Sequence, residues 1–246
     1  TGVEVDDRGA VRSVKTKNKT WPCDAIFSTM PVKDLVVAMG DVVPTELRKI
    51  ALELPYRDFM TVGLLVDELK LKNKSGTPTF HGGVPDNWIY IQERDVRMGR
   101  LQLFNNWSPY MVQNPQEQMF VGIEYFCDEG DDYWCMSDED FIRFAIDELA
   151  KIDVLDPQKV KDAVRVRVKK AYPAYFGSYK DFPKLQTFLT GIDGLYCIGR
   201  NGQHRYNNMD HSVLTAFRGV DALLGHGSKE AMWDVNTEKE YHESKA

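Results

Sequence analysis

The spacing of hydrophobic residues changes along the chain, and each pattern predicts a different kind of element. Over residues 3–14, valines alternate with polar residues on both sides of an Asp-Arg-Gly turn, which is typical of a β-hairpin. Residues 23–30 form a short apolar run that predicts a buried strand. Two helices are expected over 31–40 and 44–54, because each segment begins at a proline, which a helix start tolerates.

The hydrophobic pattern differs in the middle of the chain, where most segments predict strands. These segments are 59–68, 87–93, 100–107, 119–127 and 163–170. One helix is expected among them, over Ser137–Ile152, because apolar residues recur there at helical spacing. Its start carries the pair Ser137 and Asp140, an acidic form of the capping box.

The last part of the chain returns to alternating strand and helix. Residues 195–199 predict a short buried strand, 200–208 a loop, and 209–224 a helix that ends at Gly225. The two ends therefore indicate an α/β fold and the middle a mostly antiparallel sheet, an α+β arrangement. We expect a sheet domain over 55–171, inserted into an α/β domain made of 1–54 and 172–227 and followed by a polar tail over 228–246.

Composition and charge narrow the functional classes. The 246 residues are 43% hydrophobic and 28% charged, which excludes a disordered or collagen-like chain. The net charge of −6 disfavours nucleic-acid binding, and no apolar run approaches the ~20 residues of a membrane span. None of the four cysteines forms a Cys-x-x-Cys pair, so we expect no metal site. Reduced, buried cysteines predict a cytoplasmic protein.

The stretch from Gly199 to His211 carries the clearest chemical signal. It leaves a predicted strand, crosses a loop rich in hydrogen-bond donors, and enters a helix near Met209. The free N–H groups of a helix start favour negative charge, and Arg200 and Arg205 add two positive charges. One interpretation is an anion site at the carboxyl end of a strand. The alternative is a structural loop whose arginines pair with local carboxylates.

The same residues carry a resemblance to a known family. Gly-Arg, four residues, then Arg-Tyr-x-Asn-Met-Asp over 199–210 resembles the C-terminal flavin motif of UDP-galactopyranose mutases, in the superfamily of protoporphyrinogen oxidases and flavin amine oxidases. The stretch 11–31, ending in Ser-Thr-Met-Pro, is similar to the hairpin and strand that precede the substrate domain in these flavoproteins. Segments 87–90, 105–109 and 124–127 are similar to a bacterial branch found with glycan-biosynthesis enzymes.

One departure from the family is large. The superfamily opens with a strand–GxGxxG–helix unit that holds the ADP half of FAD, and this sequence contains no such motif. Its nearest string, Gly225-His226-Gly227, follows a predicted helix and indicates a helix stop. We therefore expect the C-terminal part of a larger flavoprotein: a partial FAD/NAD(P)-binding Rossmann-like domain with an inserted substrate domain. Such a fragment is expected to be inactive alone and to bind FAD poorly.

The resemblance implies roles for individual residues. Arg200 would lie between the flavin and a substrate diphosphate, and Met209 would present its backbone N–H to flavin N1 and O2. Asn208 stands where most mutases have aspartate. The implied cofactor contacts are Gly199, Arg200, Asn208, Met209 and Asp210; the implied substrate contacts are Arg200, Arg205 and Tyr206. Arg165 or Arg167 is a candidate second cation, against the alternative of a solvated strand face.

The implied reaction interconverts the pyranose and furanose forms of a nucleotide sugar, in cell-surface polysaccharide biosynthesis. Reduced flavin N5 forms the covalent bond to the sugar in this family, so no side chain is assigned as catalytic. The first alternative is an FAD-dependent oxidoreductase of the protoporphyrinogen oxidase or amine oxidase type. The second is a non-catalytic module that binds an anionic partner. The expected partner is a small-molecule substrate, and a homodimer is left open.

Several other residues are weaker candidates. The aromatic residues of the middle segments suit either a ligand pocket or a core; they are Trp88, Tyr90, Phe104, Trp107, Tyr110 and Tyr125. The acidic residues of 128–132 are expected to form a solvated turn, and His81 a loop position. His211 is expected to pack or to cap the last helix rather than to act as a base.

Overall fold

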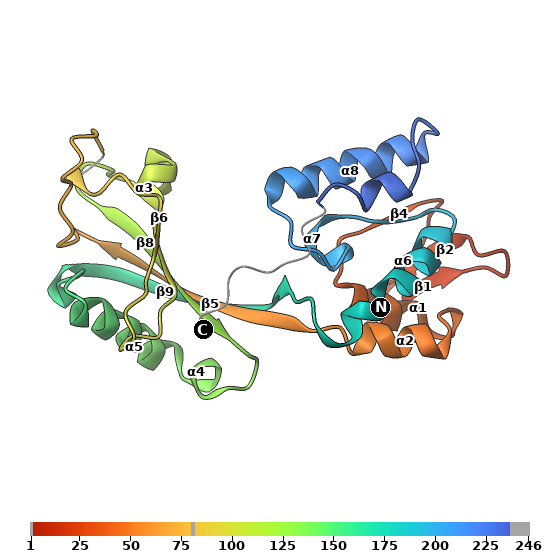
Figure 1. Ribbon diagram of the computed structural model, residues 1–246, viewed down its shortest axis with the longest axis horizontal. Helices are drawn as coiled ribbons and strands as arrows, with labels where there is room; N and C mark the ends of the chain where they lie inside the picture. The colour runs from red at the N-terminus through yellow and green to blue at the C-terminus, as the bar shows by residue number, and fades with distance from the viewer. Residues whose placement is uncertain (1, 80–81, 237–246) are drawn as a thin grey trace. The chain divides into compact units, whose positions relative to one another are not determined.

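The computed structural model describes residues 2–79 and 82–236, which form two compact units (Figure 1). The first unit comprises residues 2–57 and 170–236, and the second comprises 58–79 and 82–169. Strands β5 (Tyr56–Val66) and β9 (Val160–Pro173) carry the chain across the boundaries. His81 and the last ten positions of the predicted polar tail lie outside the described residues.

The first unit opens with the predicted hairpin, to which a third strand is added. β1 (Gly2–Val5) pairs antiparallel with β2 (Val11–Lys15), and β2 pairs with β3 (Thr20–Pro22). Gly9 adopts a φ of 78° in the turn, a conformation that glycine tolerates without strain. Val3 and Val11 are buried, so the alternation does place one face of the hairpin against the core.

A parallel strand pair organises the rest of the first unit. β4 (Ile26–Ser28) pairs with β10 (Leu195–Cys197), with Leu195 opposite Ile26. The core beside this pair comes from α1 (Val32–Met39), α2 (Thr45–Leu52) and α6 (Phe182–Gly191). α1 begins after Pro31 and ends at Gly40, as predicted, and α2 begins after Pro44. The final long helix is α8 (Met209–Leu223).

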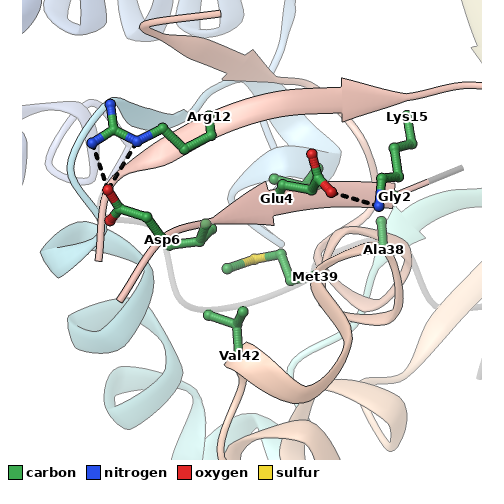
Figure 2. Close-up of a pocket in the computed structure, with 10 residues that line it drawn as sticks. Gly2, Glu4, Asp6, Arg12, Lys15, Ala38, Met39 and Val42 are labelled. Atoms are coloured by element: carbon green, nitrogen blue, oxygen red, sulfur yellow. Dashed lines mark hydrogen bonds and ion pairs between the residues drawn. The ribbon is translucent and has the colours of Figure 1, made fainter. Parts of the chain in front are cut away.

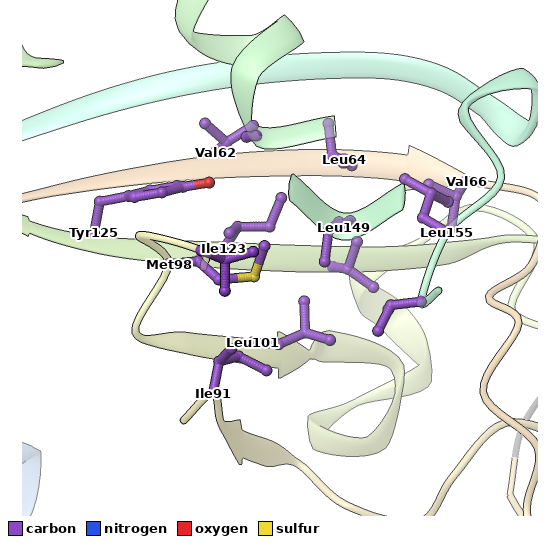
Figure 3. Packing of buried hydrophobic residues seen from close by; sticks show 14 of the residues in the cluster. Val62, Leu64, Val66, Ile91, Met98, Leu101, Ile123, Tyr125, Leu149 and Leu155 are labelled. Atoms are coloured by element: carbon purple, nitrogen blue, oxygen red, sulfur yellow. The ribbon is translucent and has the colours of Figure 1, made fainter. Parts of the chain in front are cut away.

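The second unit is built on a five-stranded sheet in the order β6-β7-β8-β5-β9. β6 (Trp88–Tyr90), β7 (Arg100–Leu103) and β8 (Met119–Cys127) form antiparallel pairs, and β8 pairs antiparallel with β5. Helix α5 (Asp138–Lys151) contributes Phe141, Ala145 and Leu149 to the core on one face of this sheet. Figure 3 shows Leu149 among core residues of the sheet that include Leu64 and Ile123. The amide of Asp140 donates to the Ser137 hydroxyl at 3.1 Å, so the predicted cap is confirmed.

Short helical turns complete the chain. They are η1 (Gly40–Val42), α3 (Phe104–Trp107), η3 (Pro109–Met111), α4 (Asp132–Cys135), η4 (Pro157–Lys159), η5 (Gly177–Asp181), α7 (Gly199–Gly202) and η6 (Glu230–Met232). Within the described ranges, no helix combines the length and hydrophobicity needed to cross a membrane.

Three sequence predictions are corrected by these bounds. The strand predicted over 100–107 ends at Leu103, and the next four residues form α3. The strand predicted over 23–30 is only three residues long. The predicted loop after β10 begins instead with a helical turn, because Gly199 reverses the chain with a φ of 74°.

Candidate functional site

The carboxyl ends of β4 and β10 meet at one edge of the first unit, because the two strands are parallel. The Ile198 amide donates to the Ser28 carbonyl at 3.0 Å, which joins the segments that leave the two strands. Gly202 lies so close to this edge that a Cβ there would stand 2.4 Å from the Ser28 oxygen. A residue larger than glycine at position 202 would therefore push α7 away from β4.

α8 begins at this edge with a reciprocal capping box. The Asn208 side chain accepts from the His211 amide, while His211 Nδ1 accepts from the Asn208 amide at 3.3 Å. The prediction that His211 caps the helix is thus confirmed. The next two N–H groups, of Met209 and Asp210, belong to the first helical turn, where no intrahelical acceptor exists. The Met209 side chain is 86% exposed.

Arg200 lies beside two tyrosine rings that stack on each other. Its guanidinium carbon is 5.2 Å from the ring centre of Tyr172 and 4.8 Å from that of Tyr206. Its Nε donates to the Asn207 carbonyl at 2.9 Å and its Nη1 to the Ala171 carbonyl at 3.2 Å. Among the described residues no carboxylate pairs with Arg200, so the alternative of a locally neutralised arginine does not apply to it.

Arg205 has different surroundings. Its Nη1 donates to the backbone carbonyls of Trp233 and Asn236, and the Asn236 side chain donates to the Tyr206 carbonyl at 2.7 Å. These bonds fasten the loop to the segment that follows α8. Trp233 is 2% exposed, so this part of the predicted polar tail packs against the first unit. Arg205 therefore stabilises the shape of the loop in addition to carrying charge.

Buried polar atoms without partners gather at the same edge. Within the described ranges, Ser28 Oγ, Asn201 Oδ1 and both side-chain atoms of Asn207 lack a hydrogen-bond partner. Ser28 is 4% exposed and Asn207 is 2% exposed. Such groups are rare in folded proteins and call for an explanation, of which a bound polar molecule is one. Donors, acceptors, a helix start and Arg200 together fit a polar, anionic cofactor or substrate.

Space at Gly199 is consistent with close approach of a ligand. Its amide donates to Thr215 Oγ1 at 2.8 Å, which anchors α7 to α8. The nearest atom that a Cβ at Gly199 would meet is Ser212 Oγ, 4.0 Å away.

His204 is a core residue. It is fully buried, with Nε2 3.1 Å from the Ala174 oxygen, and burial lowers its pKa to about 4.

Sequence reasoning missed Lys33, which follows β4 by five positions. Burial and the neighbouring Lys170 lower the pKa of Lys33. Lys170 Nζ donates to both carboxylate oxygens of Asp34, at 2.7 and 2.8 Å. Lys33 has no ion-pair partner in the part of the chain that the structure describes, and its Nζ lies 5.8 Å from the Tyr56 ring centre. Residues that follow a parallel strand lie at the edge where such sheets bind ligands, and this position was the sequence signal that could have identified Lys33.

Arg165 and Arg167, the two candidates for a second ligand-binding cation, lie on β9 in the second unit and are engaged by the protein itself. The valines of β9 are the exposed ones, at 51%, 44% and 39%, whereas the Arg165 side chain is buried. Arg165 donates to the backbone carbonyls of Tyr133, Trp134, Met136 and Ser137. Arg167 binds Asp138 at 2.6 Å and carbonyls of the same segment. Both arginines hold α4 and the start of α5, so neither is a solvated or available cation.

The other face of the second unit's sheet carries a charged pair that sequence reasoning missed. Arg100 and Glu124 lie opposite each other on β7 and β8, form a salt bridge, and are 2% and 1% exposed. Gln102 also donates to Glu124. The rings of Trp88, Tyr90 and Phe126 surround the guanidinium at 4.9, 6.0 and 4.9 Å. Of the predicted aromatic residues, Tyr125 is core, while Trp88, Tyr90, Trp107 and Tyr110 are exposed.

A cavity of about 530 Å³ lies elsewhere in the first unit, between the hairpin and α1 (Figure 2). Its charged residues neutralise one another, because Arg12 pairs with Asp6 and Lys15 with Glu4 at 2.5 Å. It contains none of the predicted site residues, and we assign it no chemistry. No group of three or more metal-ligating side chains occurs among residues 2–79 and 82–236.

Comparisons with known proteins define the fold. No family model matches the chain, and no curated protein matches it. Among solved structures, reduced UDP-galactopyranose mutase is similar, with a TM-score of 0.71 and 22% identity over 97% of this chain. A protein described as a protoporphyrinogen oxidase from Exiguobacterium sp. 255-15 has a TM-score of 0.57 and 17% identity, over 82% of this chain and 41% of its own.

An oxidoreductase from Methanosarcina mazei has a TM-score of 0.55 and 13% identity, over 91% of this chain and 48% of its own. The chain spans 47% of the length of the mutase. The structure thus has the mixed α/β fold of these mutase and oxidoreductase structures, and the fold resemblance expected from residues 199–210 is confirmed.

Proposed function

We propose that this chain is part of an FAD-dependent enzyme that interconverts the pyranose and furanose forms of a nucleotide sugar. The observation that carries the proposal is the cluster of unpartnered buried polar atoms beside Arg200 and the start of α8. The fold shared with UDP-galactopyranose mutase supports it. When bound, a reduced flavin supplies the nucleophile for such an isomerisation, with no net redox change.

The roles of the residues follow from their positions at the carboxyl edge. Gly199, Arg200, Asn208, Met209 and Asp210 form the cofactor site, in which the backbone N–H groups of Met209 and Asp210 and the positive end of the α8 dipole bind its anionic part. Arg200 and Tyr206 bind the substrate diphosphate, because a guanidinium matches phosphate oxygens in geometry and charge. Arg205 adds charge to this edge while its hydrogen bonds keep the loop in place. We place the enzyme in the cytoplasm, in cell-surface glycan synthesis.

A second candidate is an FAD-dependent oxidoreductase, which the likeness to two oxidoreductase structures favours. The two candidates differ in their use of electrons. An isomerase needs a reduced flavin but does not consume the reductant, whereas an oxidase consumes its substrate and is reoxidised by an acceptor. Arg200, unpaired with any described carboxylate, favours an anionic substrate and therefore the isomerase.

Titration with UDP, followed by the amide resonances of residues 199–210, tests the site directly. Arg200→Ala should weaken UDP binding about 10- to 100-fold, because a hydrogen bond to a charged group contributes about 1.5–3 kcal/mol. Arg205→Ala should weaken binding less and also lower the Tm, since it releases the Trp233–Asn236 segment. Arg218→Ala, on the exposed part of α8, is the matched control and should change neither. Equal affinities for Arg200→Ala and the parent chain would remove Arg200 from the site.

A further inference from the structure

The segment that leads into α8 is held by side chains from remote parts of the first unit. Residues 206–208 belong to no helix or strand, so their main-chain polar groups need partners from elsewhere. The Tyr206 amide donates to the Tyr175 hydroxyl at 2.5 Å, and the Tyr206 carbonyl accepts from Asn236 Nδ2 at 2.7 Å. Tyr206 is therefore held at both of its main-chain polar groups.

The neighbouring peptide groups carry this restraint to Arg200. The Asn207 carbonyl accepts from Arg200 Nε at 2.9 Å, and the Arg205 amide donates to the Arg200 carbonyl at 3.0 Å. The Tyr206 ring centre lies 4.8 Å from the Arg200 guanidinium carbon. A shift of the Tyr206 backbone would therefore move both an acceptor of Arg200 and the ring beside its guanidinium.

The two side chains that hold Tyr206 are themselves fixed. The Tyr175 ring packs on the ring of Tyr179, with the ring centres 4.8 Å apart. Asn236 is 8% exposed, and its carbonyl accepts from Arg205. Burial raises the pKa of Tyr175 above its ordinary value, so its hydroxyl is uncharged at neutral pH. Removal of this hydroxyl therefore takes away an acceptor without changing the charge of the site.

We propose that Tyr175 and Asn236 are positioning residues that hold Tyr206, and through it Arg200, in the arrangement that receives the anionic part of a ligand. This inference rests on the proposed function, which assigns the substrate diphosphate to Arg200 and Tyr206. Groups that are already held in place bind more tightly, because less conformational entropy is lost on binding. Tyr175 lies 31 positions before Tyr206 and Asn236 lies 30 after it, so no local motif links them in the sequence.

The test is a titration of the 246-residue chain and its variants with UDP and with inorganic pyrophosphate, by calorimetry well below the Tm. Tyr175→Phe removes the accepting hydroxyl and keeps the ring, whereas Asn236→Leu removes the donating amide. Each variant should weaken the binding of both probes about 3- to 10-fold, as expected when one uncharged hydrogen bond no longer restrains the site. In Tyr175→Phe the amide proton resonance of Tyr206 should also move upfield, because this amide loses its acceptor.

Two matched controls separate positioning from general stability. Tyr179→Phe removes the hydroxyl of the adjacent ring and leaves both bonds to Tyr206 in place, so it should keep the parent affinity. Tyr125→Phe breaks a phenol hydrogen bond to Glu148, 3.0 Å long, in the second unit. It should lower the Tm and leave the affinity for both probes unchanged.

Two results would overturn the proposal. If Tyr175→Phe binds both probes as tightly as Tyr179→Phe, Tyr175 does not position the site. If Tyr175→Phe weakens binding and Asn236→Leu does not, Tyr175 contacts the ligand itself and is not a positioning residue. Failure of the proposed function gives a different pattern. A parent chain that binds pyrophosphate but not UDP contradicts a nucleotide substrate and leaves the positioning effect to be measured with pyrophosphate, and one that binds neither probe overturns both proposals.

Discussion

Replacing Arg100 with methionine should destabilise the second unit more than replacing any exposed charged residue of that unit. Arg100 and Glu124 are 2% and 1% exposed, so the substitution leaves a carboxylate buried without its cation. Loss of one partner from a buried pair costs about 3–5 kcal/mol. Methionine keeps apolar volume beside the rings of Trp88, Tyr90 and Phe126 but loses the cation–π contacts with them, each about 0.5–2 kcal/mol.

One contact keeps the expected loss inside this range, because Gln102 still donates a hydrogen bond to Glu124. Lowering the pH should then recover stability in Arg100→Met relative to the parent, because protonation removes the buried charge. The double variant Arg100→Met/Glu124→Gln should be destabilised by less than the sum of the two single losses, with a coupling of about 2 kcal/mol.

Urea unfolding followed by tryptophan fluorescence is the assay, since Trp88, Trp107 and Trp134 all lie in the second unit. Arg143→Met, on the exposed surface of α5, is a suitable control: its bridge to Asp140 joins side chains that are 70% and 57% exposed. If Arg100→Met lowers the free energy of unfolding by less than ~1 kcal/mol at pH 7, or by the same amount at every pH, this pair is not buried and coupled as described.

Two further predictions concern titratable residues, a histidine and the cysteines. Burial lowers the pKa of His204 from 6.5 to about 4, so the unfolded chain binds a proton that the folded chain does not, and stability should fall by about 3 kcal/mol as the pH drops from 6.5 to 4. His204→Asn, which tolerates the φ of 45°, should flatten this pH dependence in urea titrations; an unchanged slope would show that His204 is not its cause. Burial also raises the pKa of Cys127 and Cys197 to about 12, whereas Cys135 is exposed. A thiol reagent at pH 8 should therefore label Cys135 first and the two buried cysteines only after unfolding, and fast labelling of Cys197 would contradict its burial.

Local signals in the sequence were sufficient to predict the positions of most helices and strands. Prolines at helix starts, glycines at helix ends and the Ser137 cap located α1, α2 and α5 because these signals act within a few residues. The sequence could suggest an anion site over Gly199–Asp210 for the same reason: a strand end, a donor-rich loop and a helix start are contiguous in the chain.

Features that depend on tertiary partners could not be predicted in this way. The alternation of β9 was recognised, but the buried face carries Arg165, because acceptor carbonyls from residues 133–137 surround its guanidinium. The Arg100–Glu124 pair depends on strand register across two separate segments. Lys33 reaches Tyr56 and Lys170 only once α1, β5 and β9 are in place.

We propose that the carboxyl edge around Arg200 serves a flavin-dependent reaction on a nucleotide sugar. The most direct measurement is the absorbance spectrum of the protein purified from the reading frame extended upstream of Thr1, followed by UDP-galactose turnover with and without dithionite. We expect a yellow protein with two flavin bands and turnover that requires reduction but consumes no reductant. A colourless protein that also fails to bind added FAD would show that the edge around Arg200 does not serve a flavin.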